Sequence, residues 1–239
     1  MDGTILFARY AFMPNMLNYC GGNDNKAIFD YCAANRTDPG LAIILRKFQA
    51  AYPYLKLIAR ANDMEDPFDT RVVEAYWIGN DLLNRVDLAQ FHNSLRERFA
   101  RQLNPATLNY LLGKPSAGAR AHHSFHVFDV HSRVGALEHS LDAMENCRIG
   151  WGRIKETGIT HFTVEHRPLV LEGSRLKLGD FIEKKVLRQI NGTGFIADPQ
   201  IGDLISFHWN WACDILAPVQ VKNLERYTSY HLEIANQTL

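Results

Sequence analysis

The hydrophobic pattern changes part-way along the chain, and this change limits the fold more than any other feature. Between about residues 24 and 112, apolar residues recur every three or four positions, as one face of an α-helix requires. From Cys147 onward they alternate with a period of two, which is typical of half-buried strands. We therefore predict an α+β protein, with a mainly helical domain over residues 1–135 and a small β-barrel with a C-terminal helix over residues 136–239.

Four apolar stripes predict helices in the first half of the chain. The stripes are Ala27, Ile28, Tyr31 and Cys32; Leu41, Ile44, Leu45 and Phe48; Val72, Val73, Tyr76, Trp77 and Leu83; and Leu88, Phe91, Leu95 and Phe99. Asp69 and Asp87 are expected to cap the last two helices. Pro39 and Pro105 suit the first turns of helices. Residues 113–118, which are rich in glycine and proline, are predicted to form a loop.

The second half is expected to contain short strands. We predict strands over residues 153–156, 160–166 and 168–172, and the clearest one over residues 204–215. In that last segment His208 is expected on the polar face, opposite the apolar and aromatic residues. Two helices complete the prediction: a short one over residues 136–145, and a final one that opens at Pro218. The apolar stripe of the final helix is Leu224, Tyr227, His231 and Ala235.

Composition excludes some partners. Lys and Arg together number 26, as do Asp and Glu, so the formal charge is zero and no long basic tract is present. Binding to a phosphate backbone needs concentrated positive charge, so we do not expect nucleic acid as a partner. The chain has neither a long apolar run for a membrane span nor the start of a signal peptide, which indicates a cytoplasmic protein. There the cysteines are expected to be free thiols. They are Cys20, Cys32, Cys147 and Cys213.

A histidine cluster lies just before the second half. His122, His123, His126 and His131 fall within residues 120–133. The apolar residues at 127–130 favour a strand, in which His122 and His126 share one face and His123 lies opposite. In a helix, His122 and His126 would instead lie one turn apart and could chelate one ion. Two interpretations stay open: binding of zinc or iron by His122, His123 and His126, and a hydrogen-bonded structural role.

Two motifs in the second half carry a resemblance. Residues 147–154, CRIGWGRI, begin with a cysteine that is followed five positions later by glycine, a basic residue and a β-branched residue. Residues 201–208, IGDLISFH, contain a Gly-Asp turn that leads into a strand carrying a histidine. In this order the two motifs resemble the signatures of the small nickel–iron hydrogenase maturation chaperone family. The whole chain, including LFARYAF at residues 6–12 and YCG at residues 19–21, further resembles an uncharacterised bacterial family associated with nickel–iron hydrogenase genes.

The chaperone resemblance implies a fold and a metal site. In that family the fold is an OB-like barrel with a C-terminal helix, and a cysteine and a histidine hold iron that carries cyanide and carbonyl ligands. Carried over by motif, these residues are Cys147 and His208. A thiolate with an imidazole suits such iron. The resemblance implies the hydrogenase large subunit or other maturation proteins as partners.

Cys20 marks another candidate site. It lies in a glycine-containing turn just before the helix that begins near Asp24. A helix N-terminus lowers the pKa of a thiol and offers amide donors to an anion, so Arg9, Tyr10 and Cys20 are expected to line a pocket for a thiol or an anion. An incidental cysteine in a turn is the alternative.

Three functions follow as hypotheses. The first is an accessory protein for nickel–iron hydrogenase maturation that binds or transfers an iron fragment. The second is a metalloenzyme or metal-binding protein that uses the histidine cluster. The third is an interaction module without catalytic activity, whose histidines are structural. The chain has no Gly-x-Ser-x-Gly elbow, phosphate-binding loop or His-Glu-x-x-His motif, and whether it catalyses a reaction stays open.

Overall fold

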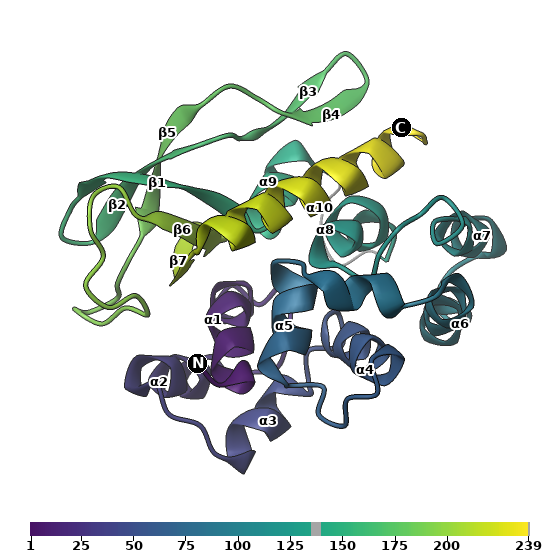
Figure 1. The fold of residues 1–239 in the computed structure, drawn as a ribbon, viewed down its shortest axis with the longest axis horizontal. Helices are drawn as coiled ribbons and strands as arrows, with labels where there is room; N and C mark the ends of the chain where they lie inside the picture. The colour runs from purple at the N-terminus through teal and green to yellow at the C-terminus, as the bar shows by residue number, and fades with distance from the viewer. Residues whose placement is uncertain (135–139, 239) are drawn as a thin grey trace.

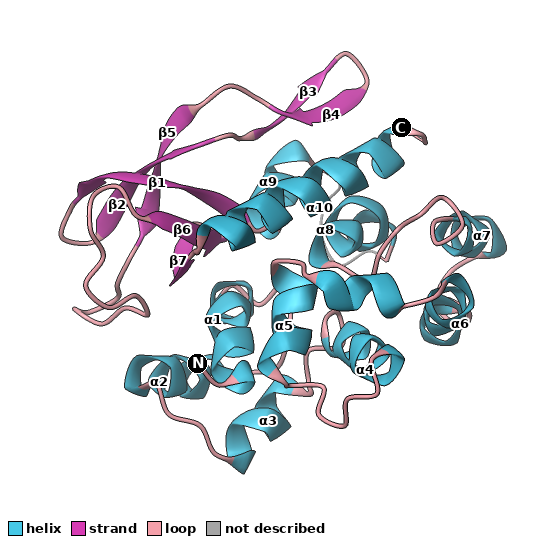
Figure 2. Ribbon diagram, viewed as in Figure 1, coloured by secondary structure: helices cyan, strands magenta, loops and turns pink. Residues whose placement is uncertain are grey.

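The computed structural model describes residues 1–134 and 140–238 (Figure 1). It confirms the α+β class: a helical region comes first, a ring of strands follows, and a long helix ends the chain (Figure 2). The first helices are α1 (Gly3–Met16), α2 (Asn25–Ala34), α3 (Pro39–Leu45), α4 (Tyr52–Ala61), α5 (Thr70–Trp77), the 3-10 helix η1 (Asp81–Arg85), α6 (Leu88–Phe99) and α7 (Pro105–Gly113). After a histidine-rich segment come α9 (Leu141–Cys147), the strands and α10 (Pro218–Asn236).

The expected helix starts are confirmed. The Asp69 side chain accepts a hydrogen bond from the backbone of Arg71, and Asp87 forms a capping box with Gln90. Pro39 and Pro105 occupy first turns. The short helix expected over residues 136–145 corresponds in part to α9, and residues 136–139 lie outside the described residues.

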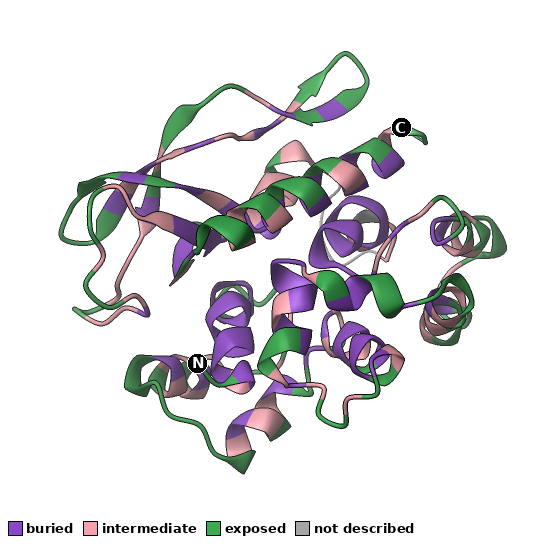
Figure 3. Cartoon of the chain, viewed as in Figure 1, coloured by how far each residue is buried: buried purple, intermediate pink, exposed green. Residues whose placement is uncertain are grey.

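Helix α1 was not predicted. Its residues from Gly3 to Asn15 are buried except Thr4, because the helix is apolar almost all the way round and lies between the other helices and the strands (Figure 3). A helix of this kind lacks the polar face on which recognition of an amphipathic helix depends. Both halves of the chain pack against this helix.

Five strands form a closed ring in the order β1-β2-β5-β7-β6. The strands of the chain are β1 (Gly150–Thr157), β2 (His161–His166), β3 (Leu169–Glu172), β4 (Arg175–Leu178), β5 (Ile182–Leu187), β6 (Leu204–His208) and β7 (Trp211–Ile215). Neighbours in the ring are antiparallel except β5 and β7, which run parallel where Leu187 pairs with Trp211. Strands β3 and β4 form a separate hairpin that extends along α10 (Figure 1).

The single strand expected over residues 204–215 is wrong, because this segment is a hairpin. Strands β6 and β7 are joined by Trp209 and Asn210, whose φ angles are 49° and 60°. A two-residue turn with both φ angles positive matches the right-handed twist of paired strands. The alternation of apolar and polar residues continues through this turn, which is why the sequence pattern predicted one strand. As a consequence His208 ends β6 and is only 2% exposed, not on a polar outer face.

One hydrophobic cluster contains residues from both halves of the chain. Phe12 of α1 packs edge-on against Trp211 of β7, with ring centroids 5.2 Å apart. The Tyr10 hydroxyl lies 2.8 Å from Ser206 Oγ on β6. The division into domains at residues 135 and 136 stays a prediction. In the described parts of the chain, no helix is long and apolar enough to cross a bilayer.

Replacing Gly152 with alanine is expected to lower the free energy of unfolding by about 1–3 kcal/mol, as overpacking does. A Cβ there would lie 2.3 Å from the Glu165 carbonyl oxygen, across the β1–β2 pair. Chemical denaturation measures the effect. The matched control is Gly113→Ala at the end of α7, where a Cβ meets nothing within 4 Å. Equal stability of the two variants would contradict the tight approach of these strands.

Candidate metal centre

The histidine segment is helical, so the predicted strand is wrong. It forms α8 (His123–Phe125), the π-helix η2 (His126–Val130) and the 3-10 helix η3 (His131–Arg133). Residues 121–130 are all buried, so no exposed face reveals the period, and tertiary packing overrides the strand propensity of the valines. Single turns of π-helix occur often at functional sites.

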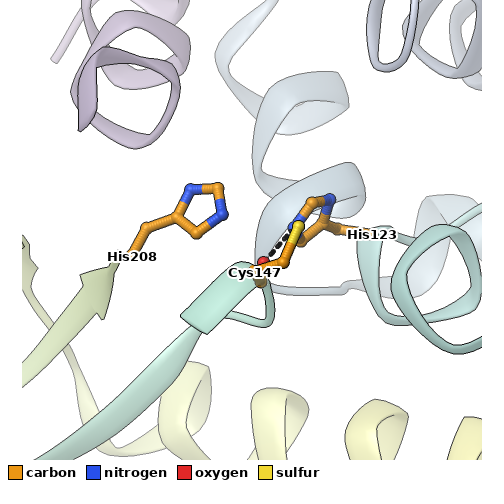
Figure 4. Close-up of side chains that lie close together, drawn as sticks. All are labelled: His123, Cys147 and His208. Carbon is orange, nitrogen blue, oxygen red and sulfur yellow. Dashed lines mark hydrogen bonds between the residues drawn. The ribbon is translucent and has the colours of Figure 1, made fainter. Parts of the chain in front are cut away.

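Three side chains from distant parts of the sequence, one of them from this segment, lie close together (Figure 4). His123 comes from the start of α8, Cys147 from the end of α9, and His208 from the end of β6. Each offers one ligand atom, and these atoms all lie within 4.8 Å of one another. All three residues are at least 94% buried. We call His123, Cys147 and His208 the central trio.

His208 has the arrangement of a metal ligand. Its Nδ1 lies 2.7 Å from the Tyr10 carbonyl oxygen, which can only accept, so Nδ1 carries the proton and Nε2 has the lone pair. Nε2 is buried and has no hydrogen-bond partner within the described residues. Metal-binding histidines commonly donate their other N–H to a carbonyl in this way. A buried lone pair without a donor is what a metal ion would satisfy.

His123 is more constrained. Its Nε2 lies 2.8 Å from the Cys147 carbonyl oxygen and therefore donates. Its Nδ1 lies 3.2 Å from the Tyr76 hydroxyl, which can turn to donate. The ring thus has partners at both nitrogens, and coordination of a metal requires one of these contacts to open. Cys147 and His208 are therefore the readier ligands of the group, and His123 could add a third.

The other histidines of the cluster do not all lie at the central trio. His126 and His131 line the same cavity of about 370 Å³ as the central trio. The Cys147 sulfur lies 3.5 Å from His131 Nδ1, and His126 Nδ1 is buried without a hydrogen-bond partner in the described chain. His122 points elsewhere: it caps α8 through the Ser124 backbone and stacks on Tyr227. A chelate of His122 with His126 is therefore not formed.

Burial keeps these side chains uncharged. It lowers the pKa of His208 and of His131 to about 4 each. Burial also lowers the pKa of His123, together with repulsion from His208 and His126. Burial also raises the pKa of Cys147, although Trp209 opposes this rise. Neutral imidazoles have a lone pair available for a metal, while the thiol must lose its proton when a metal binds.

The second candidate site is only partly formed. Cys20 lines the cavity of the central trio, and burial raises its pKa to about 12, the direction opposite to the expected activation by a helix N-terminus. Arg9 instead pairs with Asp214 of β7 at 3.0 Å. Tyr10 stacks on Trp77, and its carbonyl orients His208. Tyr10 therefore supports the candidate site through its carbonyl, whereas Arg9 does not contact the trio, and neither residue lines the cavity that Cys20 lines.

Sequence reasoning missed three contributors to the site. They are the Tyr10 carbonyl, the Tyr76 hydroxyl and the Trp209 side chain. Tyr76 and Trp209 were assigned to apolar stripes, and a backbone carbonyl has no side-chain signal. The position of Trp209 next to His208 was the only sequence hint.

Acid is expected to destabilise the protein through its buried histidines. His231 has its pKa lowered to about 3 by burial, from 6.5 when unfolded, so the unfolded chain binds the additional proton between these values. Stability is then complete above pH 6.5 and falls below it by about 1.4 kcal/mol per pH unit for each such group. Urea unfolding between pH 7 and 5 should show a shallower fall in His231→Gln. An identical slope in both proteins would contradict this burial.

Fold and site together define an α+β protein with a buried His-Cys-His group that can hold a metal ion. The chain belongs to DUF6390, a family of unknown function whose match covers residues 1–239. No curated protein and no solved structure matches the chain. The family match includes no link to hydrogenases, so that association stays a prediction.

Proposed function

We propose that this protein binds a metal through Cys147 and His208, with His123 as third ligand, and that it acts as an accessory protein in nickel–iron hydrogenase maturation. One observation carries the proposal. Two short motifs, each supplying one expected ligand, are separated by 46 residues between their ends, yet their ligand atoms lie within 4.8 Å. The unpaired Nε2 of His208 adds a lone pair in need of a cation.

The donor set agrees with an iron fragment as cargo. A thiolate and an imidazole suit low-spin iron whose other positions hold strong-field ligands such as cyanide and carbonyl. The adjoining cavity of about 370 Å³ offers room beyond that of a bare ion. Burial of the central trio keeps water away from the fragment. Zinc is the alternative metal for the same donors.

The strand arrangement supports the chaperone resemblance. If only the five ring strands are numbered along the chain, their order around the ring is first, second, third, fifth, fourth. The third and fifth of these, β5 and β7, run parallel. This order is the one we associate with OB-like barrels. The hydrogenase large subunit and other maturation proteins are the proposed partners.

Infrared spectroscopy tests the cargo. The protein is coexpressed without oxygen together with hydrogenase maturation proteins and then purified. Wild type is expected to show cyanide and carbonyl bands, and Cys147→Ala is expected to lose them. Wild type without these bands would contradict the role as iron carrier.

A second function, that of a zinc or iron metalloenzyme, is favoured by one observation. His126 and His131 line the same cavity as the central trio, which gives the metal neighbours able to handle protons. Metal analysis of His123→Ala and His126→Ala separates the cases. Unchanged metal content in both variants would remove the histidine cluster from the site. Absence of metal from every preparation would instead favour an interaction module.

A further inference from the structure

Cys20 reaches the metal cavity from the helical half of the chain. It lies in the segment between α1 and α2 and lines the cavity together with Cys147 and His208. Within the described residues, no hydrogen bond to its sulfur is found. Cys32 and Cys213 are buried inside the main hydrophobic cluster, whereas Cys20 is only partly buried, packs against that cluster and lines the cavity. Cys20 is thus the second thiol placed at the cavity.

The turn that carries Cys20 is held firmly in place. The side-chain amide of Asn15, a residue only 1% exposed, donates to the carbonyl oxygens of Cys20 and Gly22 at 2.9 and 2.6 Å. Gly21 has a φ of 83°, and a Cβ there would lie 2.6 Å from the Phe48 ring. Such a close approach to the neighbouring ring admits only glycine. Cys20 is therefore fixed at the cavity wall.

The same turn contacts the strand hairpin that supplies His208. Tyr19 stacks on Trp209 with ring centroids 4.2 Å apart and an angle of 24° between the planes. Trp209 directly follows His208 in the sequence. Cys20 and Cys147 both line the same cavity, so the two thiols lie on the walls of one space.

Unpaired nitrogens in this space point independently to a ligand. His208 Nε2 and His126 Nδ1 are buried and have no hydrogen-bond partner in the described residues. The two residues are 2% and 5% exposed, and both line the cavity. Buried polar atoms are nearly always satisfied, so these two indicate a ligand that supplies the missing contacts.

We propose that Cys20 is a second sulfur ligand of the metal, which rests on the proposed metal-binding function. Its sulfur is not part of the group within 4.8 Å, so loading must bring the sulfurs of Cys20 and Cys147 closer together, by rotation of the side chains and not by movement of the turn. Each thiol releases one proton to solvent as its metal–sulfur bond forms. With His208 and His123 this gives two sulfur and two nitrogen donors, a set that suits tetrahedral metals. The metal then links the helical half to the strand ring.

Cobalt(II) tests the proposal because its thiolate bonds give a charge-transfer absorption that grows with their number. The full chain is titrated with cobalt(II) alone, without oxygen and under reducing conditions. Cys20→Ala is expected to lose about half of the wild-type absorption per metal and to bind cobalt about tenfold more weakly or worse. Cys147→Ala should lose a similar share. Cys32→Ala, which removes a thiol from the core, should leave the spectrum unchanged.

The possible results separate the two proposals. If wild type binds cobalt and Cys20→Ala matches Cys32→Ala, Cys20 is no ligand although the metal function stands. If wild type shows no thiolate–cobalt absorption, both proposals fail. Circular dichroism melts verify that each variant is folded, and Cys20→Ser replaces Cys20→Ala if alanine disturbs the turn. A loss in both Cys20 variants with normal melts supports the two-sulfur site.

Discussion

Replacing Cys147 with alanine is expected to weaken binding of a divalent transition metal by more than about 100-fold. Loss of an outer partner of a metal ligand alone costs about 10–100-fold in affinity, and loss of the ligand itself should exceed this. Cys147 supplies the anionic donor at the centre of the trio. Without it, the trio keeps only two neutral imidazoles as donors. Calorimetric titration of the metal-free protein measures the change.

The controls for this prediction lie in the same chain. His208→Ala should weaken binding similarly, because it removes the nitrogen that has no other partner. Cys32→Ala should bind as wild type does, since Cys32 is a buried core thiol of α2. If Cys147→Ala binds metal as well as Cys32→Ala does, the metal lies elsewhere or binds without specificity.

Replacing Lys114 with methionine is expected to lower the free energy of unfolding by about 3–5 kcal/mol. Lys114 Nζ lies 2.7 Å from Asp129 Oδ1, and their side chains are 5% and 0% exposed. The substitution leaves the carboxylate of Asp129 buried without its cation. Tyr110 still donates to that carboxylate at 2.9 Å, which limits the loss. Urea unfolding at neutral pH measures the effect.

Two further variants test the cause of that loss. In Lys114→Met with Asp129→Leu, both charges of the pair are removed, so much of the stability should return. Lys26→Met breaks the exposed ion pair with Asp30 and should change stability little. If Lys114→Met lowers the free energy of unfolding as little as Lys26→Met does, the Lys114–Asp129 pair is not buried as described. Since Asp129 belongs to η2, a loosened pair should also disturb His126 and His131.

The sequence predicted the elements whose pattern is regular and exposed on one side. The helix starts at Asp69 and Asp87 and the final helix from Pro218 are confirmed. The fully apolar α1 and the buried histidine segment were missed or misassigned, because neither has a polar face from which to read a period. The turn at Trp209 and Asn210 was hidden by alternation that continues through it.

The candidate site could be predicted only in pieces. Cys147 and His208 were selected through the chaperone resemblance, and His123 was one of several clustered histidines. These residues meet through contacts between segments far apart in the chain. No local pattern in a single sequence reveals such contacts. For the same reason Cys20 was placed with Arg9 and Tyr10, whereas the fold places it with Cys147 and turns Arg9 towards Asp214.

X-ray absorption spectroscopy of the metal-loaded protein tests the central claim most directly, because it reports the atoms bound to the metal. With zinc, the account predicts sulfur at about 2.3 Å and imidazole nitrogen at about 2.0–2.1 Å in wild type. Cys147→Ala should show weaker sulfur scattering than wild type, and His208→Ala should show weaker imidazole scattering. A metal surrounded only by oxygen and nitrogen in wild type would contradict the claim that Cys147 and His208 hold one metal.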